Sequence, residues 1–376
     1  MTVETGHRNE LRKPSRVRNE SCTRSRGLAV VLAGAFASAV LVLSACGSRH
    51  VSRAPASSPG SPAAEPAVAP VPVAPPAGVS VRVGQLPEGI VADSRTGLVV
   101  VGVRDPAALV LLDARSGAVV RRVPIPGAPR HLQLVGDGGP VLVPEEPVNQ
   151  LLELSLPGAR SRSIKVGAHP HDGTADGGSV FVNDEFGESV SVIQGTRVVR
   201  QIPGFVQPGG LVAVGAGVAV VDVGGNSVTL IDAHSLRVRR RLGAGAGPTH
   251  AVAGRDGRLY VVDTRGGAVF SYSTRPTLEL LGRFSLPGAP YGIAIDRSRG
   301  RLWVTLTAKN QLVELATGDR SLRVSGRYAN GDRSLSVIGR YATGRQPNTV
   351  AVDQRDGRVF VANSDAGTVQ LIDPRR

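Results

Sequence analysis

The sequence is poor in aromatic residues and lysine, and it lacks any long stretch with a helical repeat of apolar positions. Aromatic residues make up 3% of the 376 residues while hydrophobic residues make up 41%, so a core must be built mainly from aliphatic side chains. No basic stretch is interleaved with aromatics, which argues against a nucleic-acid partner despite a formal charge of +14. Without a 3.6-residue periodicity, we expect very little helix.

Cysteine is found only twice, at Cys22 and Cys46, both in the N-terminal part of the chain. An Arg-rich stretch and an uncharged apolar run precede Leu43-Ser44-Ala45-Cys46, which resembles the lipobox of bacterial lipoproteins. The resemblance implies a signal peptide over 1–45, acylation of the Cys46 sulfur and an anchor on the extracytoplasmic face of the cell membrane. A transmembrane anchor is the alternative. A mature chain without a free thiol excludes thiol catalysis and cysteine metal sites.

The segment 46–78 follows the expected cleavage site and is dominated by Pro, Ala, Ser and Val. Eight of residues 47–78 are proline. Such a composition buries no core and favours extended conformations. We expect a tether of up to about 90 Å at roughly 3.1 Å per residue.

From residue 79 the chain repeats itself about every forty residues, and each unit begins near a proline. These prolines are Pro87, Pro129, Pro170, Pro208, Pro248, Pro290 and Pro347. Within a unit, short apolar strands are separated by turns that start with Asp and end with Gly, which is hairpin chemistry. The pattern predicts an all-β fold over 79–376, a seven-bladed β-propeller with four-stranded blades.

Two irregularities refine this prediction. The seventh unit ends without a fourth strand, so the strand-like Val79–Val83 is expected to complete it and close the ring. The sixth unit is long because residues 318–330 and 331–343 are near copies, identical at ten of thirteen positions. We expect that duplication to form an extended or extra hairpin.

Several second strands end in strings such as Tyr260-Val261-Val262-Asp263 and Phe360-Val361-Ala362-Asn363. Together with Gly-x-Pro at the blade starts, as in Gly127-Ala128-Pro129, they resemble the YVTN family of propeller repeats over residues 79–376. The resemblance implies an extracytoplasmic, YncE-like propeller. It concerns structural residues, so it does not specify a function. Blades two and three depart most, at residues 143–146 and 182–185.

Two sets of polar residues are expected to converge at one mouth of the channel. One set follows the blade-start prolines and comprises His131, His171, Asp172 and His250, and the other lies at the ends of second strands and includes Asp184, Asp222 and Asp263. Imidazoles and carboxylates together suit a small ligand or a divalent metal, the latter on His131, Asp172 and His250. The alternative is that these carboxylates only cap turns.

These observations favour a binding or scaffold module, expected to be a monomer, whose partner is a protein, a cell-wall glycan or a small ligand. The alternative is a metal-assisted enzyme of lyase or hydrolase type using the His and Asp residues. The basic run 237–241 falls where the outer strand of blade four is expected. Charged edges resist aggregation, and contact with an anionic surface is the other explanation.

Overall fold

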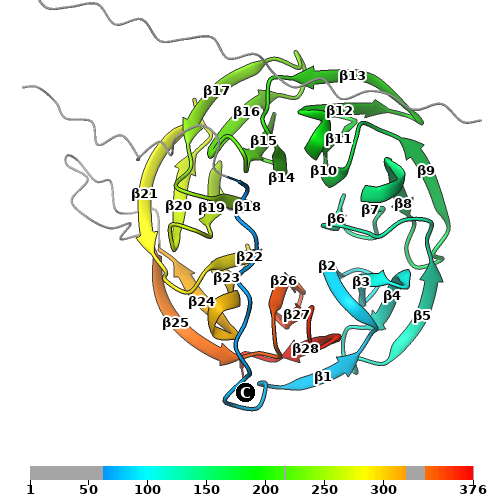
Figure 1. The fold of residues 1–376 in the computed structure, drawn as a ribbon, viewed down its shortest axis with the longest axis vertical. Coiled ribbons are helices and arrows are strands. Elements are labelled where there is room, and N and C mark those ends of the chain that lie inside the picture. The colour runs from blue at the N-terminus through cyan, green and yellow to red at the C-terminus, as the bar shows by residue number, and fades with distance from the viewer. Residues whose placement is uncertain (1–61, 216, 319–334, 376) are drawn as a thin grey trace, which may run out of the picture. The chain divides into compact units, whose positions relative to one another are not determined.

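The computed structural model describes residues 62–215, 217–318 and 335–375. Seven four-stranded antiparallel sheets are arranged around a central axis, as Figure 1 shows. The chain is therefore a seven-bladed β-propeller, as predicted. The expected signal peptide and Cys46 lie outside the described residues.

Each of the first four blades runs from an inner strand at the axis to an outer strand at the rim. Blade one comprises β2 (Gln85–Asp93), β3 (Leu98–Asp105), β4 (Ala107–Asp113) and β5 (Val119–Pro124). Blade two comprises β6 (Gln133–Leu134), β7 (Val141–Glu145), β8 (Gln150–Leu154) and β9 (Ser161–Lys165). Blade three comprises β10 (Pro170–Asp176), β11 (Ser179–Asp184), β12 (Ser189–Gln194) and β13 (Arg197–Pro203). Blade four comprises β14 (Pro208–Ala213), β15 (Gly217–Asp222), β16 (Ser227–Asp232) and β17 (Val238–Gly243).

The last three blades follow the same order, except that blade seven takes its outer strand from the start of the propeller. Blade five comprises β18 (Pro248–Ala253), β19 (Arg258–Asp263), β20 (Ala268–Ser273) and β21 (Glu279–Ser285). Blade six comprises β22 (Pro290–Asp296), β23 (Arg301–Leu306), β24 (Gln311–Thr317) and β25 (Leu335–Ala342). Blade seven comprises β26 (Pro347–Val352), β27 (Val359–Asn363), β28 (Thr368–Ile372) and β1 (Val79–Arg82).

The turn between the first two strands of blade one shows why Asp and Gly recur. The Asp93 carboxylate accepts hydrogen bonds from the backbone N–H of Thr96 and Arg95, and the Asp93 carbonyl accepts one from Gly97. Gly97 has a φ of +71°, in the left-handed region that favours glycine. The carboxylate fixes the turn while the glycine supplies its backbone geometry.

The core is aliphatic and lies between neighbouring blades. Side chains alternate along each strand, so one face of a blade packs against the preceding blade and the other face packs against the following blade. Trp303 is 1% exposed and packs with Val350, Val352 and Val361 of blade seven. The remaining clusters consist mostly of Val, Leu, Ile and Ala, as the composition requires.

The ring closes between the two ends of the propeller sequence. β1 pairs antiparallel with β28, with Val79 opposite Leu371 and Val81 opposite Val369. The next residue after β1, Val83, is fully buried against both blade seven and blade one. The prediction that Val79–Val83 supplies the missing outer strand is confirmed.

In blades two and three, where the sequence departs most from the repeat pattern, a single turn of 3-10 helix follows the second strand. These turns are η1 (Glu146–Val148) and η2 (Glu185–Gly187), and blade six has a third, η3 (Thr307–Lys309). Within the described ranges no helix has the length and hydropathy needed to cross a membrane. Most of the duplicated segment, residues 319–334, lies outside the described part of the chain.

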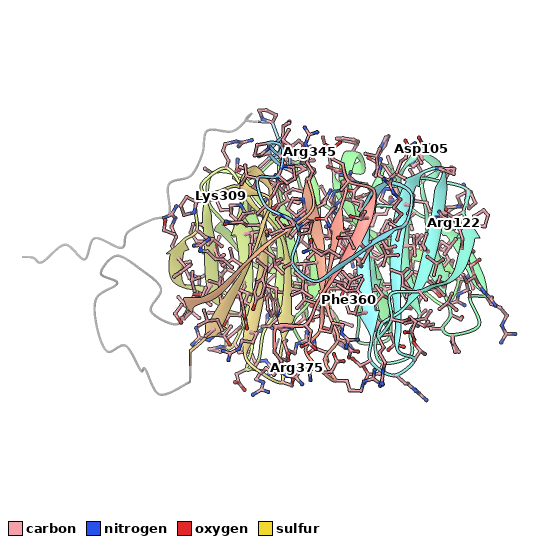
Figure 2. All side chains as sticks on the ribbon, turned by 90° about the horizontal axis from the view of Figure 1, so that it is seen from below. Asp105, Arg122, Lys309, Arg345, Phe360 and Arg375 are labelled. Atoms are coloured by element: carbon pink, nitrogen blue, oxygen red, sulfur yellow. The ribbon has the colours of Figure 1, made fainter. Side chains whose placement is uncertain are left out.

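We call the face on which the inner strands begin the upper face. Figure 2 shows the propeller from the side, with Arg345 and Lys309 near the upper face and Arg375 at the lower face.

The segment preceding β1 lies on the upper face instead of leading away from it. The Gln346 side chain accepts a hydrogen bond from Ala69 N at 2.8 Å and donates one to Ala67 O at 2.8 Å. Asn310 donates to Pro70 O at 2.8 Å, and Ala69 is 2% exposed. Figure 1 shows this segment in blue crossing the blades near β18, β22 and β26. The expected tether is therefore held against the propeller from residue 62 onward.

Removal of residues 79–84 tests the closure. The deletion takes away the ladder between β1 and β28 and the buried Val83 side chain, which together should cost about 4 kcal/mol. In a domain of this size we expect the melting temperature to fall by about 10 °C, measured by circular dichroism. Deletion of residues 55–60, outside the propeller, is the matched control. An equal melting temperature in both deletions would contradict the closing role of β1.

Candidate functional site

The upper end of the channel is formed by two successive residues from each blade. The residues one position after the blade-start prolines are Glu88, Arg130, His171, Gly209, Thr249, Tyr291 and Asn348. The residues two positions after them are Gly89, His131, Asp172, Gly210, His250, Gly292 and Thr349. The two sets occupy equivalent positions at the starts of the inner strands, and we call them the first and the second layer.

Glycine and histidine have opposite roles in the second layer. A Cβ atom on Gly89 would lie 2.3 Å from the carbonyl oxygen of Arg130, and one on Gly292 would lie 2.3 Å from that of Asn348. Backbone of the next blade therefore occupies the space where a side chain would stand. His131 and His250 fill the axis between these close approaches.

The Nε2 atoms of His131 and His250 lie 2.8 Å apart. Nδ1 of His250 is 3.1 Å from the carbonyl oxygen of Tyr291, which can only accept, so this ring carries its proton on Nδ1. Its Nε2 is then an acceptor, and the network assigns the proton of the shared hydrogen bond to Nε2 of His131. Two blades on opposite sides of the axis are thus joined by one imidazole–imidazole hydrogen bond.

His171 joins the pair from the first layer. Its Nδ1 is 3.0 Å from the carbonyl oxygen of Gly209, and its Nε2 is 2.7 Å from a guanidinium nitrogen of Arg130. Since the guanidinium can only donate, this ring also carries its proton on Nδ1. The centroids of the His131 and His171 rings are 4.8 Å apart. Three neutral imidazoles therefore meet at the axis.

Burial lowers the pKa of all three imidazoles well below the ordinary value of 6.5. The charge of Arg130 acts in the same direction on each ring. At neutral pH the rings are hydrogen-bonding groups without charge.

A network of ion pairs surrounds Arg130 on the upper side of the histidines. Glu88 accepts from Arg130 at 2.9 Å and from Arg104 at 2.9 Å. Arg104 also pairs with Glu146 at 2.9 Å. Gln207 donates to Glu185 at 2.8 Å, and that carboxylate lies 4.0 Å from Nε2 of His171. The charges in this network are partly buried and each has a partner, as buried charges require.

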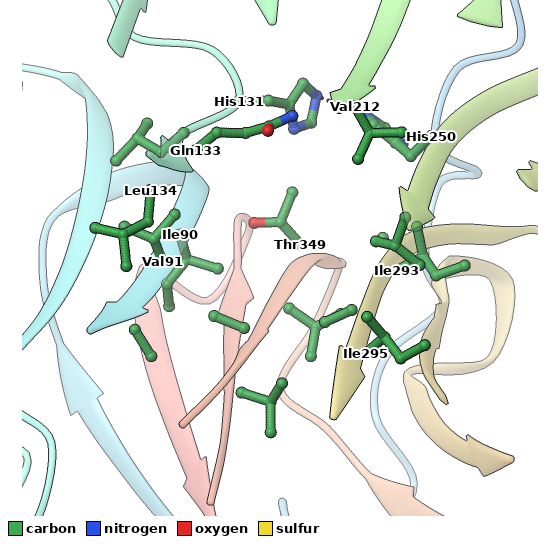
Figure 3. A pocket seen from close by; sticks show the side chains of 18 of the residues that line it. Ile90, Val91, His131, Gln133, Leu134, Val212, His250, Ile293, Ile295 and Thr349 are labelled. Carbon is green, nitrogen blue, oxygen red and sulfur yellow. Dashed lines mark hydrogen bonds between the residues drawn. The ribbon is translucent and has the colours of Figure 1, made fainter. Parts of the chain in front are cut away.

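Below the histidines the channel widens into a cavity of about 250 Å³. Most of its lining residues are apolar residues of the inner strands, including Ile90, Ile293 and Val350, but polar and apolar atoms contribute about equally to its exposed surface. Figure 3 shows His131, His250 and Thr349 at one end of this space and Ile295 farther along its wall. The lining also includes Arg297 and Gln354, which follow the lower ends of β22 and β26. The cavity therefore combines a lining of mostly apolar residues with polar residues at both ends.

Asp172 lines the cavity, but its carboxylate bonds to the neighbouring blade. It accepts from Leu211 N at 3.0 Å, from Gly173 N at 2.8 Å and from the Gln133 amide at 3.0 Å. Burial raises the pKa of Asp172 to about 8, against the opposing effect of these hydrogen bonds. Its direct role is to tie blade three to blades two and four.

The carboxylates at the ends of the second strands accept hydrogen bonds from nearby loops or from the adjacent strand. Asp222 accepts from Val206 N and Gln207 N, and Asp263 accepts from Ala246 N and Gly247 N. Asp184 accepts from the hydroxyls of Ser189 and Ser191. None of the three lines the channel cavity. The structure therefore brings together His131, His171, Asp172 and His250, but not these three aspartates.

No set of three or more His, Cys, Asp or Glu side chains is arranged to hold a metal ion in residues 62–215, 217–318 and 335–375. Of the residues expected as ligands, His131 and His250 bond to each other and Asp172 bonds to backbone and amide groups.

Sequence reasoning missed Arg130, Glu88, Arg104 and Tyr291. The first two and Tyr291 lie one residue after a blade-start proline, so the same repeat alignment shifted by one position would have found them. Arg104 is the penultimate residue of β3, and only the folded structure shows that its side chain reaches Glu88.

The fold defines the class of protein: a seven-bladed propeller whose channel has a histidine-lined upper end. Structures with similar folds include a streptogramin B lyase (16% identity, TM-score 0.63, covering 79% of this chain and 96% of that one). Hydrazine synthase of Kuenenia stuttgartiensis gives 18% identity and a TM-score of 0.67, covering 78% and 97%. Virginiamycin B lyase from Staphylococcus aureus gives 16% and 0.62, covering 78% and 98%. At these identities the likeness concerns the fold alone.

No family model matches the chain, and no curated protein matches its sequence. The resemblance to YVTN repeats therefore stays an expectation.

The buried histidines predict a loss of stability in acid. Their pKa values are lower in the folded chain than the ordinary 6.5, so the unfolded chain binds more protons as the pH falls below about 6.5. Each histidine then costs up to about 1.4 kcal/mol per pH unit until its folded-state pKa is passed. Asp172 acts in the opposite direction between its ordinary pKa and about 8.

Substitution His250→Asn isolates this effect, because an amide can still donate to the Tyr291 carbonyl but does not titrate. We expect the melting temperature to fall less between pH 7.5 and pH 5.5 in this variant than in the unaltered protein. Asp172 is present in both proteins, so its contribution cancels in the comparison. Equal falls would show that His250 is not a source of acid sensitivity.

Proposed function

We propose that the protein is a lipid-anchored, extracytoplasmic binding module whose ligand site is the cavity in the lower part of the channel. The observation that carries the proposal is the cavity itself, which is lined mostly by apolar residues of the inner strands and has polar residues at both ends. Concave sites with mostly apolar linings and a few placed polar groups are typical of small-molecule binding.

The size and chemistry of the cavity restrict the ligand. A volume of about 250 Å³ is below the roughly 300–1,000 Å³ of sites for drug-sized molecules, which indicates a small ligand. The imidazoles at the inner end are neutral, and the cationic Arg297 lies at the lower end of the lining. His131, His250 and Thr349 place polar side chains in the lining of this cavity. These features support a small apolar molecule that carries one hydrogen-bond donor, such as a hydroxyl group.

Phenol and toluene are suitable probes because they differ by one hydroxyl group. We expect phenol to bind the full chain about tenfold more tightly than toluene, the effect of one hydrogen bond. Ligand-detected NMR titration measures both affinities. Failure of both probes to bind, or equal binding of both, would contradict a ligand site with a polar inner end.

A filled cavity provides the matched control. Ile293→Trp places a larger side chain among the lining residues and should abolish phenol binding. Ile338→Trp adds the same side chain on β25, where Ile338 is 47% exposed, and should leave binding unchanged. Melting temperatures of both variants verify that they fold. Phenol binding that survives in Ile293→Trp would place the site elsewhere.

The anchor is the second part of the proposal and rests on Leu43-Ser44-Ala45-Cys46. We expect Cys46→Ala to move the protein out of the membrane fraction and to abolish incorporation of a labelled fatty acid. Substitution Cys22→Ala, in the segment expected to be removed, is the control and should change neither result. Fractionation and labelling of cells that express the three proteins measure the outcome. Retention of label in Cys46→Ala would exclude this site of acylation.

The alternative of a metal-assisted enzyme gains no specific support from the geometry. It would use His131, His250 and Asp172, whose polar atoms bond to one another or to backbone and amide groups. The likeness to the lyases concerns the fold alone. A protein or glycan partner on the flat faces is a compatible addition to the channel site.

A further inference from the structure

The outer strands of four consecutive blades form a basic surface that we call the basic arc. It comprises nine exposed cationic side chains on β5, β9, β13 and β17: Arg121, Arg122, Arg162, Lys165, Arg197, Arg200, Arg239, Arg240 and Arg241. The same four strands contain no Asp or Glu. Figure 1 shows them side by side along one part of the rim.

Most of this charge is not neutralised by carboxylates in the described part of the chain. Within the described residues, ion pairs from the arc are those of Arg162 with Glu153 at 2.6 Å and of Arg239 with Asp232 at 3.9 Å. Arg121 and Arg241 donate to main-chain carbonyl oxygens, which leaves their charge in place. Like charges held at neighbouring positions repel one another, so the arc has an unfavourable energy that an anionic partner would relieve.

Protection of sheet edges does not account for this distribution. Every blade presents the same kind of exposed outer strand, and charge of either sign on such an edge resists aggregation. The outer strands of blades five, six and seven nevertheless carry only Arg283, Arg340 and Arg82, together with the acidic Glu279. The excess of one sign on one side of the ring indicates a partner on that side.

The shape of the arc distinguishes between partners. Four consecutive blades of seven cover a convex surface, and a flat bilayer touches such a surface over a small sector only. A flexible polymer can follow the curve and contact all four blades. The four strands contain no aromatic side chain, so they offer no platform on which nucleic-acid bases stack.

We propose that the basic arc is a binding surface for a flexible, phosphate-bearing polyanion that wraps around blades one to four. Guanidinium groups suit this ligand because their planar donors match phosphate oxygens. Affinity should arise from many exchangeable contacts and should fall steeply with salt, as cations bound along the polymer are released. This surface lies on the rim and is separate from the channel site.

Long-chain inorganic polyphosphate is the probe, and the full chain with Cys46→Ser is used throughout so that no lipid anchor contributes. We expect long-chain polyphosphate to bind with a salt-dependent Kd and tripolyphosphate to bind at least tenfold more weakly. The triple variant Arg197→Gln, Arg200→Gln, Arg240→Gln should raise the Kd for the long chain at least tenfold. It should also reduce the slope of log Kd against log salt concentration.

A second triple variant removes the same number of charges from the other side of the rim. Arg82→Gln, Arg283→Gln, Arg340→Gln lowers the net charge equally but should change the Kd less than threefold. Equal weakening of polyphosphate binding in both variants would show a response to net charge alone and would overturn the proposal that the basic arc is the binding surface. Absence of binding to polyphosphate would do the same.

Vesicles of anionic and of zwitterionic phospholipid test the other source of phosphate groups. We expect the arc variant to change binding to anionic vesicles less than binding to polyphosphate. Arc-dependent binding to anionic vesicles without binding to polyphosphate would overturn the proposal in favour of a membrane surface. Single-stranded DNA of matched charge should bind no more tightly than polyphosphate, and tighter binding would contradict a phosphate-only ligand.

Discussion

The convergence of seven inner strands on one axis is the constraint on which the rest of the structure depends. Strands that converge leave almost no room for side chains at their upper ends, and Gly89 and Gly292 meet this condition by admitting the backbone of the next blade. The remaining space is filled by planar rings, of which His131 and His250 are joined across the axis. Glycine, which admits the backbone of the next blade, and histidine, whose ring fills the axis, therefore both satisfy the packing of the upper strand ends. The histidines also place polar groups in the channel.

Arg130 lies next to these polar groups. One terminal guanidinium nitrogen of Arg130 pairs with Glu88, and the other terminal nitrogen donates to His171. Burial, with the charge of Arg130 acting in the same direction, lowers the pKa of the neighbouring histidines, so they are uncharged although they lie next to an ionic network. The upper end of the channel holds ion pairs and is filled, whereas the lower part is an open cavity whose lining includes Arg297.

The sequence predicts features that depend on local patterns and misses those that depend on side-chain orientation. Proline spacing and Asp–Gly turns are local, so they revealed the seven blades and the closing strand Val79–Val83. His131 and His250 were found because they share one repeat position. The carboxylates that a ligand would need already accept hydrogen bonds within the fold, Asp184 from the hydroxyl of Ser191 and Asp222 from the backbone N–H of Val206. Which partner an aspartate takes is decided by loop geometry, and residue type does not reveal it.

The ladder between β1 and β28 has a consequence for the order in which the protein acquires its structure. Because synthesis starts at the N-terminus, β1 is the first strand of the propeller to be made and its partner β28 is the last. The two strands pair with Val79 opposite Leu371. Until the final blade has emerged, the first strand has no neighbour and the sheet edge of blade seven does not exist. A chain that stops short of β28 therefore cannot close the ring, however well its other six blades form. The pairing thus makes closure of the ring depend on the synthesis of all seven blades.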